Sequence, residues 1–178
     1  TGEALRPQEV KEMVHIAHEE GFAVMCHTNG TKAVEALIEA GADSVEHGNY
    51  MEEQTIKSLA DSELVWVPTV TVVPNMFGCG RFSDELLHKI YEKEKTNIKK
   101  GLQYGVKMAL GSDAGAYLVF HGQGIIEEYA RFLECRKEIQ EESQENEQEF
   151  LSVCELKARL KAGEAEIRKK FKKIEKSY

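Results

Sequence analysis

Four short runs of strand-like sequence are spaced along the first two thirds of the chain, at 22–26, 43–46, 64–67 and 106–110. The segments between them carry apolar residues three and four positions apart, which is the spacing of an amphipathic helix. Strands that alternate with amphipathic helices are typical of a parallel sheet covered by helices. The pattern therefore predicts an α/β fold with about four strand–helix units.

Residues with special backbone preferences mark the ends of the predicted helices. Pro7 suits the first turn of a helix that Gly21 ends, because the N–H that proline lacks would be unpaired there anyway. Thr31 is expected to cap the second helix and Gly41 to end it. Ser83, followed by two acidic residues, is expected to cap a long helix that leads into the fourth strand.

Side chains able to bind a metal follow three of the four predicted strands. His27 and His47 begin the loops after the first and second strands, and Asp113 lies in a glycine-flanked segment after the fourth. In a parallel barrel the residues just past the strand ends converge on one face, where active sites lie. One histidine alone is more often a hydrogen-bonded structural residue, but three such side chains at matching positions predict a metal site. Glu46 is expected to orient a neighbouring group rather than to bind the metal.

The loop after Asp113 holds two further candidates. Tyr117 and His121 could overhang the same face and contact a substrate, and an ordinary loop histidine is the alternative for His121. Another histidine pair, His15 and His18, lies one turn apart on the first helix. Since no third ligand lies nearby in the sequence, that pair is expected to belong to a solvated helix face.

Three motifs stand at the predicted strand ends: His-Thr-Asn-Gly at 27–30, Ser-Val-Glu-His-Gly at 44–48 and Gly-Ser-Asp-Ala-Gly at 111–115. Together they resemble the closing motifs of the metal-dependent amidohydrolases, especially the branch related to imidazolonepropionase and prolidase-like dipeptidases. The resemblance covers roughly residues 1–124. It implies the C-terminal half of a TIM-like (β/α)8 barrel, with these motifs at the ends of strands five, six and eight. The His-x-His pair of the family's first strand does not occur in the 178 residues, and the family's strand-four lysine would precede Thr1.

The resemblance also implies a function, a metal-dependent hydrolase in which a metal-activated water attacks the C–N bond of an amide, a cyclic amide or a dipeptide. His27, His47 and Asp113 would be metal ligands, and Asp113 would also be catalytic as a proton shuttle. One or two divalent ions are implied, zinc above all with other first-row metals as alternatives, and the partner would be a small-molecule substrate. A lactone or phosphotriester hydrolase on the same barrel remains an alternative, as does a noncatalytic interaction or scaffold domain.

Length and charge narrow the possible functions. A whole barrel typically needs about 250 residues, so this chain is expected to form half of one and to pair with the missing N-terminal half or with a second copy. A formal net charge of -8 and a pI near 5.4 argue against nucleic acid or an anionic membrane as a partner.

The apolar runs are far shorter than the ~20 residues of a membrane span. No basic and apolar leader opens the chain, and the cysteines are dispersed. A cytoplasmic protein with reduced thiols is expected.

The sequence changes character after residue 124. Residues 1–124 are predicted to form the half-barrel. Residues 125–178 are predicted to form a charged helical C-terminal extension, because apolar residues recur there at near-helical intervals among lysines and glutamates. This extension is expected to pack on the barrel wall or on another subunit. Gly163 is expected to be its weak point, since glycine destabilises a helix interior.

Overall fold

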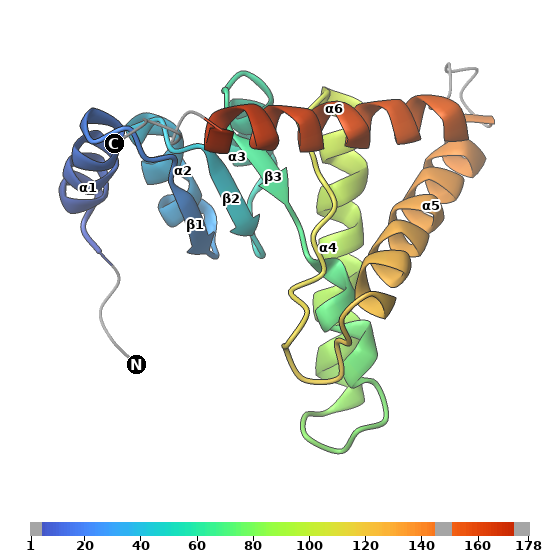
Figure 1. The fold of residues 1–178 in the computed structure, drawn as a ribbon. Helices are drawn as coiled ribbons and strands as arrows, with labels where there is room; N and C mark the ends of the chain where they lie inside the picture. Colours follow the sequence, from blue (N-terminus) through green and yellow to red (C-terminus); the bar gives the residue numbers. More distant parts are fainter. Residues whose placement is uncertain (1–4, 145–150, 173–178) are drawn as a thin grey trace.

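Three short parallel strands and their connecting helices form the N-terminal part of the molecule (Figure 1). The computed structural model describes residues 5–144 and 151–172. The strands are β1 (Met25–Thr28), β2 (Ser44–His47) and β3 (Val65–Val67). The helices are α1 (Pro7–Glu19), α2 (Thr31–Ala40), α3 (Glu53–Ala60), α4 (Asp84–Tyr104), α5 (Gln123–Gln144) and α6 (Val153–Lys172), with two 3-10 turns, η1 (Val70–Val72) and η2 (Pro74–Met76). In the described ranges no helix is long and apolar enough to cross a membrane.

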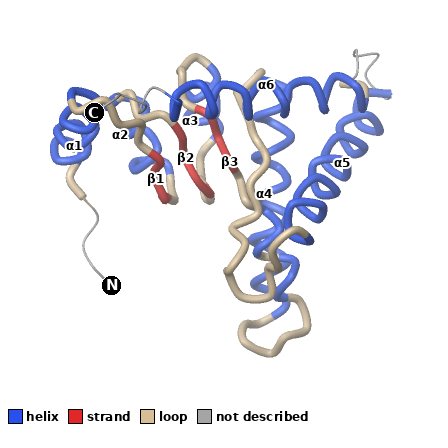
Figure 2. Tube along the Cα trace, viewed as in Figure 1, coloured by secondary structure: helices blue, strands red, loops and turns tan. Residues whose placement is uncertain are grey.

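The strands lie side by side in the order β1-β2-β3 and point the same way (Figure 2). The prediction of a full fourth strand at 106–110 is wrong. Met108 makes only a single bridge to Trp66, supported by two backbone hydrogen bonds of 2.8 and 3.0 Å. The reason lies in β3, which is three residues long and is followed by Pro68, a residue without the N–H that a ladder needs. The fold is therefore α/β and mostly helical, with a small parallel sheet.

The predicted helix ends agree with the structure except at two caps. Gly41 ends α2 in the left-handed conformation, with a φ of 69°, which glycine adopts without a steric cost. The prediction that Thr31 caps α2 is wrong, because Gly30 holds the cap position. The Thr31 hydroxyl instead accepts the Glu52 N–H at 2.9 Å and so ties the start of α3 to α2. Ser83 does stand at the cap of α4, but its side chain makes no capping hydrogen bond.

The two faces of the sheet pack against different helices. Val45 and Trp66 are buried in one cluster with apolar residues of α2, α3 and α4. A Cβ on Gly101 of α4 would lie 3.0 Å from the Trp66 ring, so this helix packs directly on the sheet. The buried core on this side also contains Val34, Leu37, Ile56, Leu59, Ile98 and Leu102.

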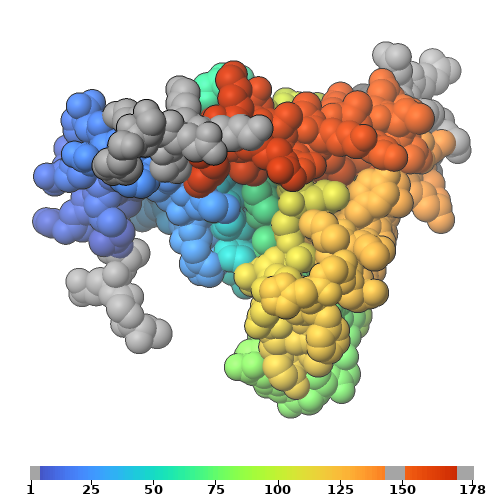
Figure 3. Space-filling model, in the orientation of Figure 1, coloured from blue at the N-terminus to red at the C-terminus, as the bar shows by residue number. Residues whose placement is uncertain are grey.

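The C-terminal helix α6 covers part of the opposite face. Val65 and Val67, which alternate with Trp66 along β3, pack in a buried cluster with Ile167 of α6. Lys170 of the same helix donates from Nζ to the carbonyl oxygens just before β2 and β3, at 3.2 and 2.6 Å. The helix thus crosses the sheet near the N-terminal ends of its strands, and Figure 3 shows it as a continuous ridge on this side of the molecule.

Gly163 is not a weak point of α6, contrary to the expectation. The helix runs through it without a break. Its α-carbon lies so close to the carbonyl oxygen of Met108 that a Cβ would clash. Glycine is therefore required here because the helix backbone touches the backbone of the bridging segment.

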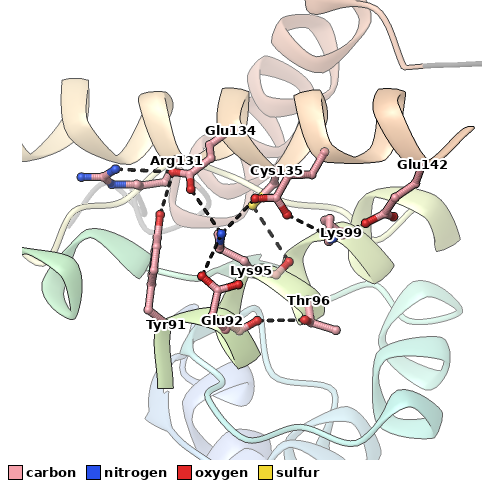
Figure 4. A network of polar contacts seen from close by, with 10 residues as sticks. Tyr91, Glu92, Lys95, Thr96, Lys99, Arg131, Glu134, Cys135 and Glu142 are labelled. Carbon is pink, nitrogen blue, oxygen red and sulfur yellow. Dashed lines mark hydrogen bonds and ion pairs between the residues drawn. The ribbon is translucent and has the colours of Figure 1, made fainter. Parts of the chain in front are cut away.

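Ion pairs join α5 to α4 (Figure 4). Only 8% of the Lys95 side chain is exposed, and its Nζ lies 3.0, 3.3 and 2.9 Å from carboxylate oxygens of Glu92, Glu134 and Glu138. Tyr91 donates its hydroxyl to Glu134 at 2.8 Å. A largely buried lysine with three carboxylates around it therefore holds the two helices in register.

Candidate functional site

Two imidazoles meet at the ends of β1 and β2. The centroids of the His27 and His47 rings are 4.5 Å apart, with the rings edge to face at 71°. The prediction that His47 begins a loop is wrong by one residue, because His47 is the last residue of β2. His27 does not begin the loop as predicted but lies inside β1, where it pairs in register with Glu46. The parallel pairing of the two strands brings the two rings together, because it aligns their C-terminal ends.

The backbone at His47 is held in an uncommon conformation. His47 has a φ of 66° and Gly48 a φ of 67°. The His47 carbonyl accepts the indole N–H of Trp66 at 2.7 Å. A Cβ on Gly48 would lie 2.9 Å from that same indole nitrogen. Glycine is therefore needed at position 48, where the turn packs against the tryptophan.

The His47 ring is half-buried and makes one polar contact, between its Nδ1 and the Thr69 hydroxyl at 2.5 Å. Burial lowers the pKa of His47, the neighbouring His27 lowers it further, and Asp113 acts in the opposite direction. The neutral ring is thus favoured at neutral pH. Neutral imidazole is the form that binds metal ions.

Asp113 lies in an exposed turn after the Met108 bridge and has a φ of 54°. Its negative charge raises the pKa of His47 against the effects of burial and His27. However, among residues 5–144 and 151–172 no three His, Cys, Asp or Glu side chains lie close enough together to hold a metal ion. The structure therefore pairs His27 with His47 and leaves Asp113 outside a three-ligand cluster. The two imidazoles fit as part of a ligand set for a divalent cation.

Glu46 is held beside the pair. Its Oε1 accepts the Ser44 hydroxyl at 2.7 Å, while its Oε2 is buried and has no hydrogen-bond partner among the described residues. Burial raises the pKa of this carboxyl group. Because Glu46 pairs in register with His27, its side chain lies next to that imidazole on the sheet. The orienting role expected for Glu46 stays a prediction.

Strained backbone is concentrated at this end of the sheet. In the described part of the chain, five residues other than glycine have a positive φ, and three of them are His47, Thr69 and Asp113. Such conformations persist where the surrounding structure enforces them, often at functional sites. Thr69 is the residue that the sequence reasoning missed. Its only local signal is its place directly after Pro68 at the end of a strand.

The predicted substrate-contacting residues lie in the loop that leads to α5. Tyr117 and His121 are both exposed there. The Tyr117 ring packs under the guanidinium of Arg81, 5.2 Å from its centroid. A groove of about 970 Å³ lies along the outer edge of β1, away from this loop, and is lined by residues such as His27 and Met25. Substrate contact by Tyr117 and His121 stays a prediction.

Comparison with known proteins identifies the family. The sequence matches the Amidohydrolase family over residues 4–153, a range that includes both imidazoles and Asp113. The chain belongs to the amidohydrolase family. The resemblance of the three motifs to the amidohydrolases is therefore confirmed. The family match ends where α6 begins.

Amidohydrolase relatives match this chain over part of their length. An uncharacterized protein of Mycobacterium tuberculosis is 29% identical over 120 residues, covering 64% of this chain and 32% of the relative. Ochratoxinase of Aspergillus niger is 27% identical over 112 residues, covering 60% of this chain and 23% of that enzyme. Among solved structures, a Xaa-Pro dipeptidase with bound methionine superposes with a TM-score of 0.63 at 23% identity, covering 76% of this chain and 34% of that protein. The chain thus spans about a third or less of the length of these relatives.

Proposed function

We propose that this chain is the closing half of a metal-dependent amidohydrolase that hydrolyses a C–N bond in a small-molecule substrate. The observation that carries the proposal is the contact between His27 and His47, whose rings lie 4.5 Å apart at the ends of adjacent parallel strands. Two imidazoles in contact at this end of a parallel sheet are suited to bind one divalent cation between them. Membership of the amidohydrolase family supports the reaction class.

The half-barrel proposal rests on the free edge and the length of the chain. β1 is an edge strand, with β2 on one side and the 970 Å³ groove on the other. A full barrel typically has eight strands and about 250 residues, and this chain spans 34% of the Xaa-Pro dipeptidase that it resembles. A preceding segment of the same protein, or a second copy, would pair with β1. The segment that closes the barrel would also bring the ligands that the imidazole pair lacks.

A divalent ion, zinc above all with another first-row metal as the alternative, would bind to His27 and His47. When bound, such an ion polarises a carbonyl group and makes a water molecule more acidic. Asp113 would accept a proton at its carboxylate and pass it to the leaving nitrogen. Tyr117 and His121 would contact the substrate from the loop that follows Asp113.

The substrate class is proposed from the relatives. The Xaa-Pro dipeptidase and the ochratoxinase favour an amide or dipeptide over a lactone or a phosphotriester. The chain's own contribution would be the open, partly apolar groove beside His27, in which Met13, Met25 and Tyr50 could contact an apolar side chain.

Metal binding and hydrolysis test the proposal separately. Cobalt(II) added to the purified chain should give the absorption of a nitrogen-ligated ion. We expect weak binding, because two ligands do not complete a site. His27→Gln and His47→Gln should each weaken the binding at least about tenfold. His15→Gln, on the exposed face of α1, is the matched control and should change nothing. If the cobalt affinity is unchanged in both His27→Gln and His47→Gln, the metal assignment is wrong.

For hydrolysis, the chain would be mixed with the N-terminal part of a family member and supplied with zinc. A panel of Xaa-Pro dipeptides, N-acyl amino acids, a lactone and a phosphotriester would then be compared. We expect turnover of a C–N substrate by the mixture and negligible turnover by the chain alone. Turnover of only the lactone or the phosphotriester would reject the C–N assignment, and robust turnover by the chain alone would reject the half-barrel proposal.

A further inference from the structure

The hydrogen bonds of the Thr69 hydroxyl determine which nitrogen of His47 carries a proton. Thr69 Oγ1 donates to the carbonyl oxygen of Pro68 at 2.7 Å. A hydroxyl has a single proton, and a carbonyl oxygen can only accept. With the hydroxyl proton directed at Pro68, the second contact of Oγ1, to His47 Nδ1 at 2.5 Å, is one in which the ring donates. Nδ1 is therefore the protonated nitrogen, and Nε2 keeps its lone pair.

Thr69 is an improbable residue for its backbone conformation. Its φ and ψ are 54° and 36°, in the left-handed region. A β-branched residue is a genuine outlier there, and glycine would be free of the steric cost. The side chain is nevertheless buried, with 6% of the residue exposed. The hydroxyl contact with His47 gives a reason for a threonine at a position where the backbone favours glycine.

A buried carboxylate on α5 holds the turn that carries Thr69. Glu128 is 0% exposed. Its Oε1 accepts the Val70 N–H at 3.0 Å and its Oε2 accepts the Thr71 N–H at 2.8 Å. The two N–H groups directly follow Thr69 in η1. A buried carboxyl group is costly unless it is hydrogen-bonded, so this bidentate contact anchors the turn firmly to a residue 58 positions away.

We propose that Thr69 is the positioning residue of His47. It accepts the Nδ1 proton, turns the ring, and presents the Nε2 lone pair to a cation, while Glu128 keeps Thr69 in its strained conformation. Metal-binding histidines commonly have their second nitrogen held by such a partner. The identity of the cation rests on the proposed function. The tautomer itself does not, because it follows from contacts within the chain.

The tautomer can be measured directly in the metal-free chain. Imidazole nitrogen NMR of the full chain labelled with ¹⁵N-histidine, at a pH where His47 is neutral, distinguishes the two forms. The His47 signals are assigned by their loss in His47→Gln. We expect the Nδ1–H form in the wild type. Finding the Nε2–H form there would overturn the proposal without any further variant.

Two substitutions of Thr69 separate the hydroxyl from the shape of the side chain. Thr69→Val keeps the branched shape and removes the hydroxyl, so His47 should move toward the Nε2–H form that an unconstrained histidine prefers in water. Cobalt(II) affinity should fall about 10–100-fold with it. Thr69→Ser keeps the hydroxyl, so this variant should retain both the Nδ1–H form and the cobalt affinity of the wild type. If the tautomer is the same in all three proteins, Thr69 does not position His47.

Glu128→Gln tests the anchor, because an amide can accept only one of the two N–H groups. Hydrogen exchange at the Val70 and Thr71 amides should become faster, and His47 should show a mixture of tautomers. Glu141→Gln, at an exposed position of the same helix, is the matched control and should show neither effect. Unchanged exchange and an unchanged tautomer in Glu128→Gln would remove Glu128 from the proposal.

The outcomes separate this proposal from the proposed function. If no cation binds, yet His47 is Nδ1–H and Thr69→Val changes it, then the metal assignment fails and the positioning role stands. If a cation binds in a His47-dependent way, yet Thr69→Val leaves both tautomer and affinity unchanged, then the metal assignment stands and the positioning role fails.

Discussion

Gly163 of α6 and Met108, the residue that bridges to β3, touch through their backbones, with no room for a Cβ between them. This contact lays α6 across the sheet face opposite α4. On that face Ile167 then reaches the valines of β3. A residue without a side chain therefore determines how closely the last helix of the chain approaches the sheet.

Replacing Gly163 by alanine tests this contact. In an ordinary helix interior the change would stabilise the protein by up to about 1 kcal/mol. Here we expect it to lower the free energy of unfolding by about 1–3 kcal/mol, because the new methyl group overpacks against a backbone carbonyl. Urea unfolding followed by circular dichroism measures the difference. Ala162→Gly, at an exposed position of α6, is the control and should cost about 1 kcal/mol. A more stable Gly163→Ala protein would contradict the contact.

Replacing Lys95 by methionine tests the ion pairs between α4 and α5. The change leaves three carboxylates close together without their shared cation, so we expect a loss of about 1–3 kcal/mol in the free energy of unfolding. This is less than for a fully buried pair, since the glutamates are partly exposed. Lys89→Met removes an exposed pair with Glu85 on the same helix and should cost about 0.5 kcal/mol or less. Equal losses in the two variants would argue that the Lys95 network is not specially stabilising.

The buried Glu94 predicts a pH dependence of stability. Burial raises the pKa of Glu94 to about 8, and the charge of Glu128 contributes. The folded chain therefore binds this proton more tightly than the unfolded chain. The stabilisation is complete below the unfolded pKa near 4.5 and is lost as the pH rises toward about 8.

Glu94→Gln isolates this effect, because the amide resembles the protonated acid. Between about pH 5 and about pH 8, the variant should gain at least about 1.4 kcal/mol relative to the wild type, the equivalent of one pKa unit. Urea unfolding at several pH values gives the two curves. Glu85→Gln, on the exposed side of the same helix, should follow the wild type. Parallel curves for Glu94→Gln and the wild type would show that Glu94 is ionised in the folded chain.

Replacing Asp113 by asparagine tests the proton shuttle in the assembled barrel. The amide keeps the shape but cannot accept a proton, so kcat should fall about 10²- to 10⁴-fold. The fold should persist, because Asp113 is exposed. His121→Ala should mainly raise KM, and Asp61→Asn, at the exposed end of α3, is the control for a lost surface charge. If Asp113→Asn retains most of the activity, Asp113 is not the proton shuttle.

No strand in the described part of the chain pairs with the outer edge of β1, which predicts self-association. Met25 of this strand is 55% exposed, and a free strand edge tends to pair with another chain. Light scattering should show a mass that rises with concentration. Met25→Lys should reduce the rise by charging the edge, whereas Leu86→Lys, at an exposed site on α4, should not. A concentration-independent monomer with cooperative unfolding would count against the half-barrel proposal.

The sequence alone determined the local elements and the family. Gly41 ends its helix as predicted, because the left-handed conformation is a local property of one residue. The three strands of the sheet lie within two or three residues of their predicted places. His47 could be found as a strand-end histidine because its motif combines a short strand, the histidine and a glycine in a few consecutive positions.

Tertiary structure decided the features that join distant positions. Met108 has one bridge rather than a strand because β3, some forty residues earlier, is too short to pair with more. The contact of Thr69 with His47 spans 22 positions and that of Glu128 with Val70 spans 58. No periodicity links such residues. Propensity and hydrophobic spacing describe neighbours along the chain, whereas the orientation of the His47 ring depends on which distant side chains the packing brings to it.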